Sequence, residues 1–402
     1  MHLNRGQEEL LRGDGGVPEQ IAMELLTKYG DSIGAESLVA VKSAHLGGSS
    51  PELTDVGIGL LGRLASSGKG FRVPTSCNPA AIDLATWEGS GVSAGAARDQ
   101  LQIRDGLVRM GVIRSWTNVP FQVCNFPKPG EPVSWGDRGA AIFANSVLGC
   151  RTNCMAAGPG IASAFLGLAP SHGLLLEEER RAGIACSVPD VDLPGLDYGS
   201  LGYLIGKVSG ARIPAVLGIP RSATSDDLKH LGAAAGSAGR LSMICYAGVS
   251  EGWASPQLAA GWQRLERLEV QKSDIDEAGA ELTQAGEPPD LVALGSPHLS
   301  VTELGILAKR LEGRKVRPGV RLQAFTSLQA HEMASASGIR ADIESAGGEL
   351  WGGVDPAVAP LSEMGFHVVL TDSAYLAATL MSARKVKVRY APLSRIIGEV
   401  TD

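Results

Sequence analysis

The stretch that decides the fold is LVALGSPHLSVTELGILAKRLEGRKVRPGVRLQAF, residues 291–325, in the C-terminal third of the chain. Its two ends, residues 291–295 and 320–325, are apolar runs typical of buried strands. Between them, Ser300 and Glu303 have the spacing of a capping box, in which each side chain satisfies an amide at the start of a helix. A strand, a helix and a second strand in this order predict a right-handed crossover onto a mostly parallel sheet.

The same alternation continues to the end of the chain. Three further strands are predicted, each after a helix, at residues 348–351, 367–370 and 386–390. We therefore expect a C-terminal α/β domain of alternating strands and helices over residues 290–402, preceded by an N-terminal and middle α/β region over residues 1–280. The charged segment 276–290 contains glycine and a proline pair, so it is predicted to be a linker or a domain edge.

The first two thirds of the chain give weaker signals. A helix is predicted over residues 18–28 and a strand over residues 37–42. A second strand is predicted at residues 71–73, leading into a turn and a helix within residues 74–84, PTSCNPAAIDL. The middle third is rich in glycine and alanine, which is typical of an interior where backbones approach each other closely.

Length and composition bound the class of protein. The chain has 402 residues, 36 Lys and Arg against 43 Asp and Glu, and 44% hydrophobic residues, so two or three globular domains are expected and disorder is excluded. The acidic balance argues against nucleic-acid or membrane-surface partners. Residues 155–176 are uncharged, but prolines and glycines interrupt them, so we expect a buried loop and helix rather than a membrane span. The six cysteines show no disulfide pattern and no secretory signal is present, so a cytoplasmic protein is predicted.

Polar residues follow each strand predicted in the C-terminal domain. In a parallel sheet of this kind, ligands bind in the crevice at the carboxyl ends of the strands. The residues at those ends are small or polar, which makes them candidates for a site, although single Ser, Thr and Asp residues there can also be helix caps. They are Ser296, His298, Thr326, Ser327, Asp355 and residues 371–373.

Eight segments, collinear over nearly the whole chain, resemble the large subunit of the aconitase X family. They include SAHLGGSS (43–50), WGDRGAAIFANSVLGCRTN (135–153), LKHLGAAAGSAG (228–239) and LGSPHLSVTEL (294–304). The resemblance implies an aconitase-like, multi-domain α/β fold with mostly parallel sheets around a central cleft. It also implies an activity, the dehydration of small hydroxy acids such as mevalonate 5-phosphate or cis-3-hydroxyproline.

Iron–sulfur members of this family hold a cluster through three cysteines, and the chain departs from the pattern at each of them. The family's Cys-Thr-Pro-Tyr is matched by Asn118-Val-Pro-Phe121, its Gly-Cys-Pro-His by Gly295-Ser-Pro-His298, and its third cysteine aligns on Asp355. Because such clusters need thiolates, we expect none here. The three oxygen-bearing residues could instead hold Mg²⁺ or Ca²⁺, form a hydrogen-bonding floor for a substrate, or fill the vacated position.

Other departures lie in motifs that the resemblance places along the cleft. The family's Gly-Glu-Ser-Ser is Gly136-Asp-Arg-Gly139, its Thr-Asn-Ser-Ala-Lys is Thr371-Asp-Ser-Ala-Tyr375, and its Arg-Glu after Arg-Thr-Asn is Cys154-Met155. The fold is therefore expected to be kept and the chemistry to be changed. The family's small swivelling domain has no counterpart in this sequence, so a separate small subunit is expected to supply it, unless the protein works without one.

Several residues are candidates for binding a small carboxylate. His45, in a glycine-rich loop after a strand, and His298 are possible general acids or bases, or else histidines bonded to the backbone. Arg151 with Asn153 could clamp a carboxylate through the planar guanidinium, or Arg151 could form a buried structural ion pair. Further candidates are polar residues in turns and at helix starts: Thr75, Asn78, Ser237, Thr371 and Ser373.

Three cysteines are new relative to the family pattern. Cys150 and Cys154 are four residues apart, a spacing that suits two metal ligands on a helical turn, and Cys124 could be a third. A nucleophilic thiol is a second interpretation. The third is that all three are small buried hydrophobic residues, as free cysteines usually are.

The sequence thus predicts a cluster-free lyase that removes a proton next to a carboxylate and eliminates, isomerises or cyclises a small hydroxy or amino acid. Its predicted catalytic residues are His45, His298, Asn118, Ser296 and Asp355, with a histidine or Asp355 protonating the leaving hydroxyl. The alternative is a non-catalytic scaffold that pairs with a swivelling small subunit. If an enzyme, Asn118, Ser296 and Asp355 should approach within roughly 10 Å around one polar pocket, with His45 and Arg151 on its walls.

Overall fold

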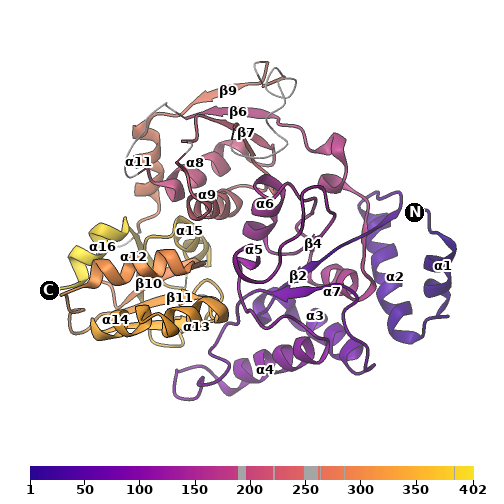
Figure 1. Cartoon of the computed structure of the whole chain (residues 1–402), viewed down its shortest axis with the longest axis horizontal. Helices are drawn as coiled ribbons and strands as arrows, with labels where there is room; N and C mark the ends of the chain where they lie inside the picture. The colour runs from indigo at the N-terminus through magenta and orange to yellow at the C-terminus, as the bar shows by residue number, and fades with distance from the viewer. Residues whose placement is uncertain (189–195, 221, 249–260, 263, 285, 384) are drawn as a thin grey trace.

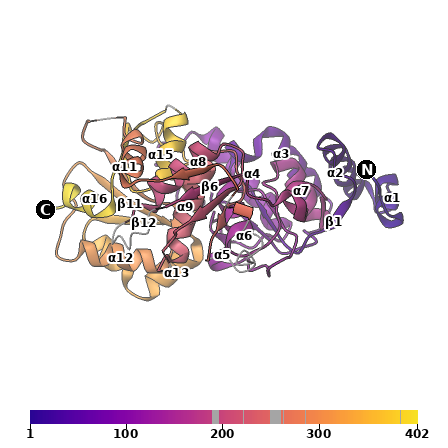
Figure 2. The same cartoon turned by 90° about the horizontal axis from the view of Figure 1, so that it is seen from above.

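Three lobes, each with its own parallel sheet, form the molecule in the computed structural model (Figure 1). The structure describes residues 1–402 except 189–195, 221, 249–260, 263, 285 and 384. The N-terminus and the C-terminus lie at opposite ends of the molecule, and the view from above shows the same separation (Figure 2). The predicted mostly parallel α/β architecture is confirmed.

The C-terminal sheet contains the five predicted strands in the order β12-β11-β10-β13-β14, all parallel. These strands are β10 (Leu291–Leu299), β11 (Arg321–Thr326), β12 (Gly348–Gly352), β13 (Val368–Thr371) and β14 (Lys387–Tyr390). Because β10 is central and the chain winds outward from it in both directions, the crevice predicted for ligands lies at its carboxyl end. β10 runs four residues further than predicted, with a register shift between Leu294 and Leu299.

Alternate residues of β10 enter two different cores. Val292 and Leu294 pack with Leu304 and Leu307 of α12 (Val301–Leu311), whereas Leu291 and Ala293 face the opposite core. The other helices are α13 (Leu328–Ala336), α14 (Ile339–Ser345), α15 (Ala374–Ala383) and α16 (Leu393–Val400). The predicted capping box of α12 is confirmed, since Ser300 Oγ accepts from the Glu303 amide at 3.2 Å and Glu303 accepts from the Ser300 amide at 2.8 Å.

The N-terminal lobe has a parallel sheet in the order β3-β2-β4. The strands are β2 (Ala44–Leu46), β3 (Thr75–Cys77) and β4 (Ser134–Trp135), and a separate antiparallel pair joins β1 (Leu38–Ala40) to β5 (Leu168–Pro170). Around them lie α1 (Arg5–Arg12), α2 (Val17–Ser32), α3 (Ser50–Ala65), α4 (Ala94–Arg109), α5 (Pro120–Val123), α6 (Arg138–Ser146) and α7 (Ala157–Leu166). The buried helix and loop expected at residues 155–176 are α7 and β5.

Two predictions in the N-terminal lobe are wrong. The strand lies at Thr75–Cys77 rather than at residues 71–73, and no helix forms within residues 74–84. Tertiary pairing overrides the local pattern, because the Ala80 amide donates to Gly353 of the C-terminal domain at 2.9 Å and so cannot enter a helix.

The middle lobe has a four-stranded parallel sheet in the order β8-β7-β6-β9. Its strands are β6 (Ile184–Ser187), β7 (Pro214–Leu217), β8 (Cys245–Tyr246) and β9 (Arg267–Glu269), and its helices are α8 (Tyr198–Ser209), α9 (Ser225–Ala238) and α11 (Lys272–Glu281). The first part of the linker predicted at residues 276–290 is therefore helical. The reason is tertiary, since Ile275 and Ala278 bury the inner face of α11. No helix in the described ranges is both long and apolar enough to cross a membrane.

Glycines let α8 and α9 approach each other closely, as the glycine-rich middle third predicted. A Cβ atom at Gly202 would lie 2.2 Å from the Leu231 carbonyl oxygen, and one at Gly206 would lie 2.3 Å from the Ala235 carbonyl oxygen. These obstacles are backbone atoms, so neither helix can accept a side chain without moving. The packing of α9, which carries one wall of the candidate active site, depends on these glycines.

We predict that Gly206→Ala lowers the free energy of unfolding by about 1–3 kcal/mol, because overpacking forces two helices apart. The matched control is Gly59→Ala in α3, where a Cβ atom meets nothing within 4 Å. That variant should be neutral or more stable by about 0.5–1 kcal/mol, since alanine favours a helix. Thermal unfolding midpoints measure both. A Gly206→Ala protein that melts at or above the wild-type temperature would contradict this explanation of the α8–α9 contact.

Candidate active site

Asn118, Ser296 and Asp355 meet in the structure, as predicted. Asp355 accepts hydrogen bonds from Ser296 Oγ at 2.7 Å and from Asn118 Nδ2 at 2.5 Å. Ser296 lies in the irregular part of β10, Asp355 follows β12, and Asn118 lies in the N-terminal lobe just before α5. All three are buried, so the cluster ties the first lobe to the third at the carboxyl edge of the sheet.

Burial gives Asp355 an unusual titration. Loss of hydration raises its pKa to about 7, although bonds from the Ala357 amide and from Ser296 oppose the shift. The nearby carboxylates of Glu52 and Asp137 raise the pKa further. Asp355 therefore changes protonation near neutral pH, which is where a general acid or base is most useful.

His298 is a structural residue in this arrangement. Its amide donates to Asn118 Oδ1 at 2.9 Å, its Nε2 donates to the Val354 carbonyl at 2.8 Å, and its Nδ1 lies 3.0 Å from Thr117 Oγ1. Burial lowers its pKa to about 3, so the ring is neutral. Both ring nitrogens are occupied, which matches the backbone-bonded alternative for this histidine.

A second polar cluster surrounds His45. The Nε2 of His45 donates to Asn78 Oδ1 at 2.7 Å, and its Nδ1 lies 2.9 Å from Ser76 Oγ. Asn78 Nδ2 donates to Glu52 at 2.5 Å and to Asp137 at 3.2 Å. Burial lowers the pKa of His45 to about 4 against the opposing pull of Asp137, so this ring is neutral and orients Asn78.

Sequence reasoning missed three residues that the structure brings to this place: Glu52, Asp137 and Tyr375. Glu52 belongs to the capping box of α3, and Asp137 caps α6 by accepting from the Ala140 amide at 2.7 Å. Burial and the charges of Asp355, Asp137 and Glu52 raise the pKa of Tyr375 well above its usual value. Asp137 and Tyr375 both lie in segments that depart from the family pattern, and this departure was the available signal.

The space open to a ligand lies beside Asp137 and Tyr375. A cavity of about 330 Å³ is lined by α6, α9 and α15, which lie together near the centre of the molecule (Figure 1). A smaller one of about 10 Å³ continues inward to Asn118, Pro297 and Lys229. Four residues line both spaces: Asp137, Gly139, Ala233 and Tyr375. The cluster of Asn118, Ser296 and Asp355 is therefore closed, and the usable cavity is on its outer side.

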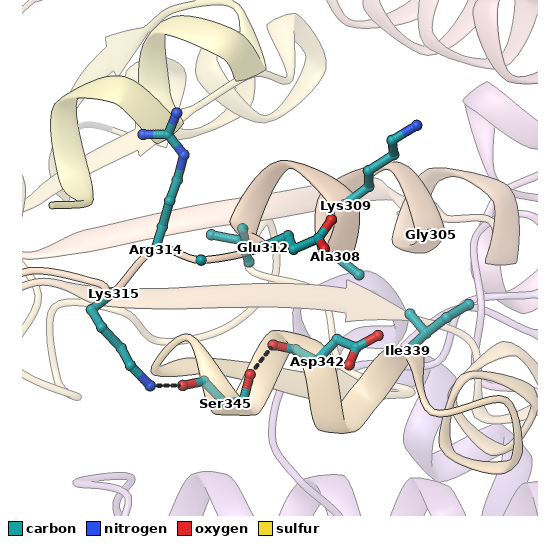
Figure 3. A pocket seen from close by; sticks show the side chains of 11 residues that line it. Gly305, Ala308, Lys309, Glu312, Arg314, Lys315, Ile339, Asp342 and Ser345 are labelled. Atoms are coloured by element: carbon teal, nitrogen blue, oxygen red, sulfur yellow. Dashed lines mark hydrogen bonds between the residues drawn. The ribbon is translucent and has the colours of Figure 1, made fainter.

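A larger cavity lies elsewhere in the described structure. It measures about 640 Å³ and lies between α12 and α14 at the outer end of the C-terminal domain (Figure 3). Lys309, Arg314 and Lys315 line it together with Glu312 and Asp342, and Lys315 bonds the Ser345 carbonyl. This space has mixed charge and shares no residue with the site around Asp137, so we do not assign the chemistry to it.

Other candidates fall outside the cavity and make structural contacts. Arg151 is paired with Glu177 at 2.5 Å, which is the ion-pair alternative, although the pair is partly exposed rather than buried. Asn153 bonds the backbone of His172 and Leu174 at 2.7 and 2.9 Å. The hydroxyl of Thr75 donates to the Val73 carbonyl at 2.8 Å. These three side chains therefore bond to groups other than the Asp355 cluster.

The prediction for Ser237 is wrong in one respect. Ser237 does line the cavity of about 330 Å³. It lies in the last turn of α9, however, where its hydroxyl donates to the Ala234 carbonyl at 2.7 Å, rather than at a helix start. Carbonyl groups, which repel anions, point out of this end of a helix. At the sheet edge, Ser373 donates to the Ser296 carbonyl and accepts from the Leu376 amide, and Thr371 Oγ1 accepts from the Ser373 amide at 3.1 Å.

The cysteines do not form a metal site or an activated thiol. Cys150 and Cys154 lie in the irregular segment between α6 and α7, not on a helical turn, because α6 ends at Ser146. Their thiols donate to the carbonyls of Lys128 and Gly136 at 3.3 and 2.9 Å. Burial raises the pKa of Cys150 to about 12 and that of Cys154 to about 11, and it also raises that of Cys124. Within the described ranges, no three His, Cys, Asp or Glu residues could hold a metal ion.

The donor set at the three aligned positions does not fit an iron–sulfur cluster. Asn118, Ser296 and Asp355 provide an amide, a hydroxyl and a carboxyl group, and their polar atoms are bonded to one another. Iron–sulfur clusters are held by thiolates. A hard cation is no better served, because the Asn118 atom facing Asp355 is an NH₂ group, which cannot act as a ligand.

Mostly parallel α/β lobes that meet around buried carboxyl groups define this chain as a multi-domain protein of the aconitase-like class. Models of the first, second and third aconitase X domains match residues 1–178, 182–280 and 289–402. The chain belongs to the aconitase X family.

Its relatives include enzymes of two names. The chain is 37% identical over 380 residues to the phosphomevalonate dehydratase large subunit of Methanothermobacter thermautotrophicus, covering 93% of this chain and 92% of that one. It is 32% identical over 403 residues to the cis-3-hydroxy-L-proline dehydratase of Pseudomonas aeruginosa, covering 98% and 68%. The crystal structure of Thermococcus kodakaraensis aconitase X (holo-form) matches all of both chains with a TM-score of 0.89 and 28% identity. The predicted family, fold class and lyase class are confirmed.

The raised pKa of Asp355 leads to a prediction about stability. The Asp355 carboxyl has a pKa near 3.9 in the unfolded chain and about 7 in the folded protein. Its contribution to the free energy of unfolding is therefore full below the unfolded pKa. It decreases as pH rises from there and is lost once pH has passed the folded pKa of about 7. The loss between pH 5 and pH 8 is on the order of 2–3 kcal/mol. Asp355→Asn, which stays neutral, should have a flatter pH dependence of its thermal midpoint over this interval.

The control for this measurement is Glu344→Gln, an exposed partner of Arg340, which should keep the wild-type slope. Equal slopes for the wild type and Asp355→Asn would show that Asp355 is already ionised in the folded protein at pH 5.

Proposed function

We propose that this chain is a hydro-lyase that removes water from a small hydroxy carboxylic acid bound in the cavity beside Asp137 and Tyr375. The observation that carries the proposal is the position of these two side chains, which line both cavities and stand next to a carboxyl group with a pKa of about 7. A carboxylate and a protonated phenol facing one space supply a base and an acid. The names of the relatives, both dehydratases, support the same reaction.

The reaction divides between the two side chains. Asp137 takes the proton from the carbon next to the substrate carboxylate, and the electron pair of that bond forms the new double bond. The bond to the hydroxyl oxygen breaks, and Tyr375, whose high pKa keeps it protonated, gives this oxygen its proton so that water leaves. The proton on Asp137 then returns to Tyr375, which restores the starting state.

The remaining polar residues position these groups. Asn78 donates to Asp137 and is itself oriented by neutral His45. Asn118, Ser296 and Asp355 hold the floor behind the smaller cavity, and the charge of Asp355 helps to keep Tyr375 protonated. The resemblance aligns Asn118, Ser296 and Asp355 with the family's three cluster cysteines. These three residues are polar rather than apolar, which favours an enzyme over the non-catalytic scaffold.

We further propose that the chain pairs with a small subunit that covers this cavity. Several relatives bear the name large subunit, and the cavity between α6, α9 and α15 opens to the surface. We propose a cytoplasmic location, which agrees with the absence of any disulfide among the six cysteines, all of which lie in described segments.

We predict that Asp137→Asn lowers kcat for dehydration at least about 100-fold, because an amide cannot take the proton. Asparagine also caps helices, so α6 should remain intact. The assay follows loss of water and exchange of the carbon-bound proton by NMR in D₂O, with mevalonate 5-phosphate and cis-3-hydroxy-L-proline as first substrates. Asp83→Asn, a turn aspartate bonded to the Ala85 amide, is the matched control and should keep full activity. Full activity of Asp137→Asn would remove Asp137 from the chemistry.

We also predict that the protein purified without oxygen is colourless and contains no stoichiometric iron or sulfide. The reason is the lack of a thiolate at Asn118, Ser296 and Asp355. Iron and acid-labile sulfide analysis and a visible spectrum check this result. A brown sample with stoichiometric sulfide would show that other residues hold a cluster and that the metal-free reaction is wrong.

A further inference from the structure

Arg138 lines the cavity, and its guanidinium has more N–H donors than its contacts in the described structure use. It is the first residue of α6, directly after Asp137, and its exposed side chain lines the cavity of about 330 Å³ with Tyr375. Its Nη1 donates to the Leu241 carbonyl at 3.5 Å, which is a long bond. Across the described residues it takes part in no ion pair, unlike Arg151, which is held by Glu177. A guanidinium has five N–H donors, so most of those of Arg138 face solvent or a ligand.

The fold gives Arg138 a defined place. A Cβ atom at Gly236 of α9 would lie 3.1 Å from both Cγ and Cδ of Arg138. The arginine stem therefore lies across a position where α9 has no side chain, which keeps the stem along the cavity wall. The adjoining Gly139 also lines the cavity, so the guanidinium is not screened by a bulky neighbour.

The acidic residues of the site would repel an anionic substrate, so a cation is needed at the cavity to bind it. A hydroxy acid enters as an anion, and the inner end of the site already carries the carboxyl groups of Glu52, Asp137 and Asp355. Lys229, which lines the inner cavity, is already bonded to Asp226, Glu303 and the His298 carbonyl. Arg138 is thus the cation beside the cavity whose charge is not already matched by an acidic neighbour in the described structure.

We propose that Arg138 binds an anionic group of the substrate, a carboxylate or a phosphate, and thereby selects substrates and orients them toward Asp137. The inference rests on the proposed function and adds the substrate-binding residue to it. A planar guanidinium pairs with either oxyanion through two parallel bonds.

The experiment measures binding separately from turnover. Calorimetry with two probes, cis-3-hydroxy-L-proline and mevalonate 5-phosphate, is carried out on the wild type, Arg138→Gln, Arg138→Lys and the exposed control Arg340→Gln. We expect Arg138→Gln to weaken binding about 10-fold to 100-fold, since charged hydrogen bonds are lost. Arg138→Lys, which keeps the charge without the planar fork, should lose about 10-fold. The control should bind like the wild type.

The two probes separate the two anions. A loss confined to the phosphorylated probe assigns Arg138 to the phosphate, and a loss with both probes assigns it to the carboxylate. In steady-state assays, Arg138→Gln should raise KM more than it lowers kcat, which a merely structural defect would not do. Circular dichroism confirms that the variants are folded.

Different results overturn different claims. Unchanged binding by Arg138→Gln, with an active wild type and an inactive Asp137→Asn, overturns the role of Arg138 and leaves the proposed function standing. Binding that depends on Arg138, without any dehydration by the wild type, overturns the proposed function and leaves the anion site standing. A wild-type protein that binds neither probe overturns both.

Discussion

The hydrogen-bonded carboxyl group of Asp355 is the interaction on which the rest of this structure depends. It accepts from Ser296 and the Ala357 amide within the third lobe and from Asn118 of the first lobe. A buried carboxyl group without partners would cost several kcal/mol, so these bonds are needed for the lobes to close on it. The family resemblance implies that cluster cysteines stand at these positions in iron–sulfur members, and here Asn118, Ser296 and Asp355 form a direct link between lobes.

Crowding of acidic groups explains the chemistry that the site can support. Burial raises the pKa of Glu52 and of Asp355, and the carboxylate of Asp137 beside them raises both further. The phenol of Tyr375 faces the same charges and stays protonated. Proton donors and acceptors are therefore available near neutral pH without a histidine in that role, since both buried histidines are neutral and fully bonded.

A second buried network holds the wall of the cavity formed by α9. Lys229 bonds Asp226 on its own helix, Glu303 of α12 and the His298 carbonyl, and His230 bonds the other oxygen of Glu303 at 2.5 Å. Burial would raise the pKa of Glu303, but Lys229 and His230 hold it below its usual range, so the carboxylate is charged. Such buried ion pairs add little net stability, because desolvation offsets most of their attraction. Their main effect is to fix the orientation of the elements that they join. They fix the middle lobe on the third lobe and so set the width of the cavity.

The sequence by itself determined the parallel C-terminal sheet, the capping box at Ser300 and the meeting of Asn118, Ser296 and Asp355. Strand and helix periodicity is local, and collinear motifs carry a shared topology, so the sequence alone predicts both. Only the tertiary structure decided that no helix forms within residues 74–84, that Ser237 lies at the end of a helix, and that Arg151 pairs with Glu177 instead of lining the site. The same holds for Glu52, Asp137, Arg138 and Tyr375, whose functional positions depend on contacts between segments up to hundreds of residues apart. Burial, charge proximity and the shape of a cavity are sums over all such contacts, and no local pattern of residues contains them.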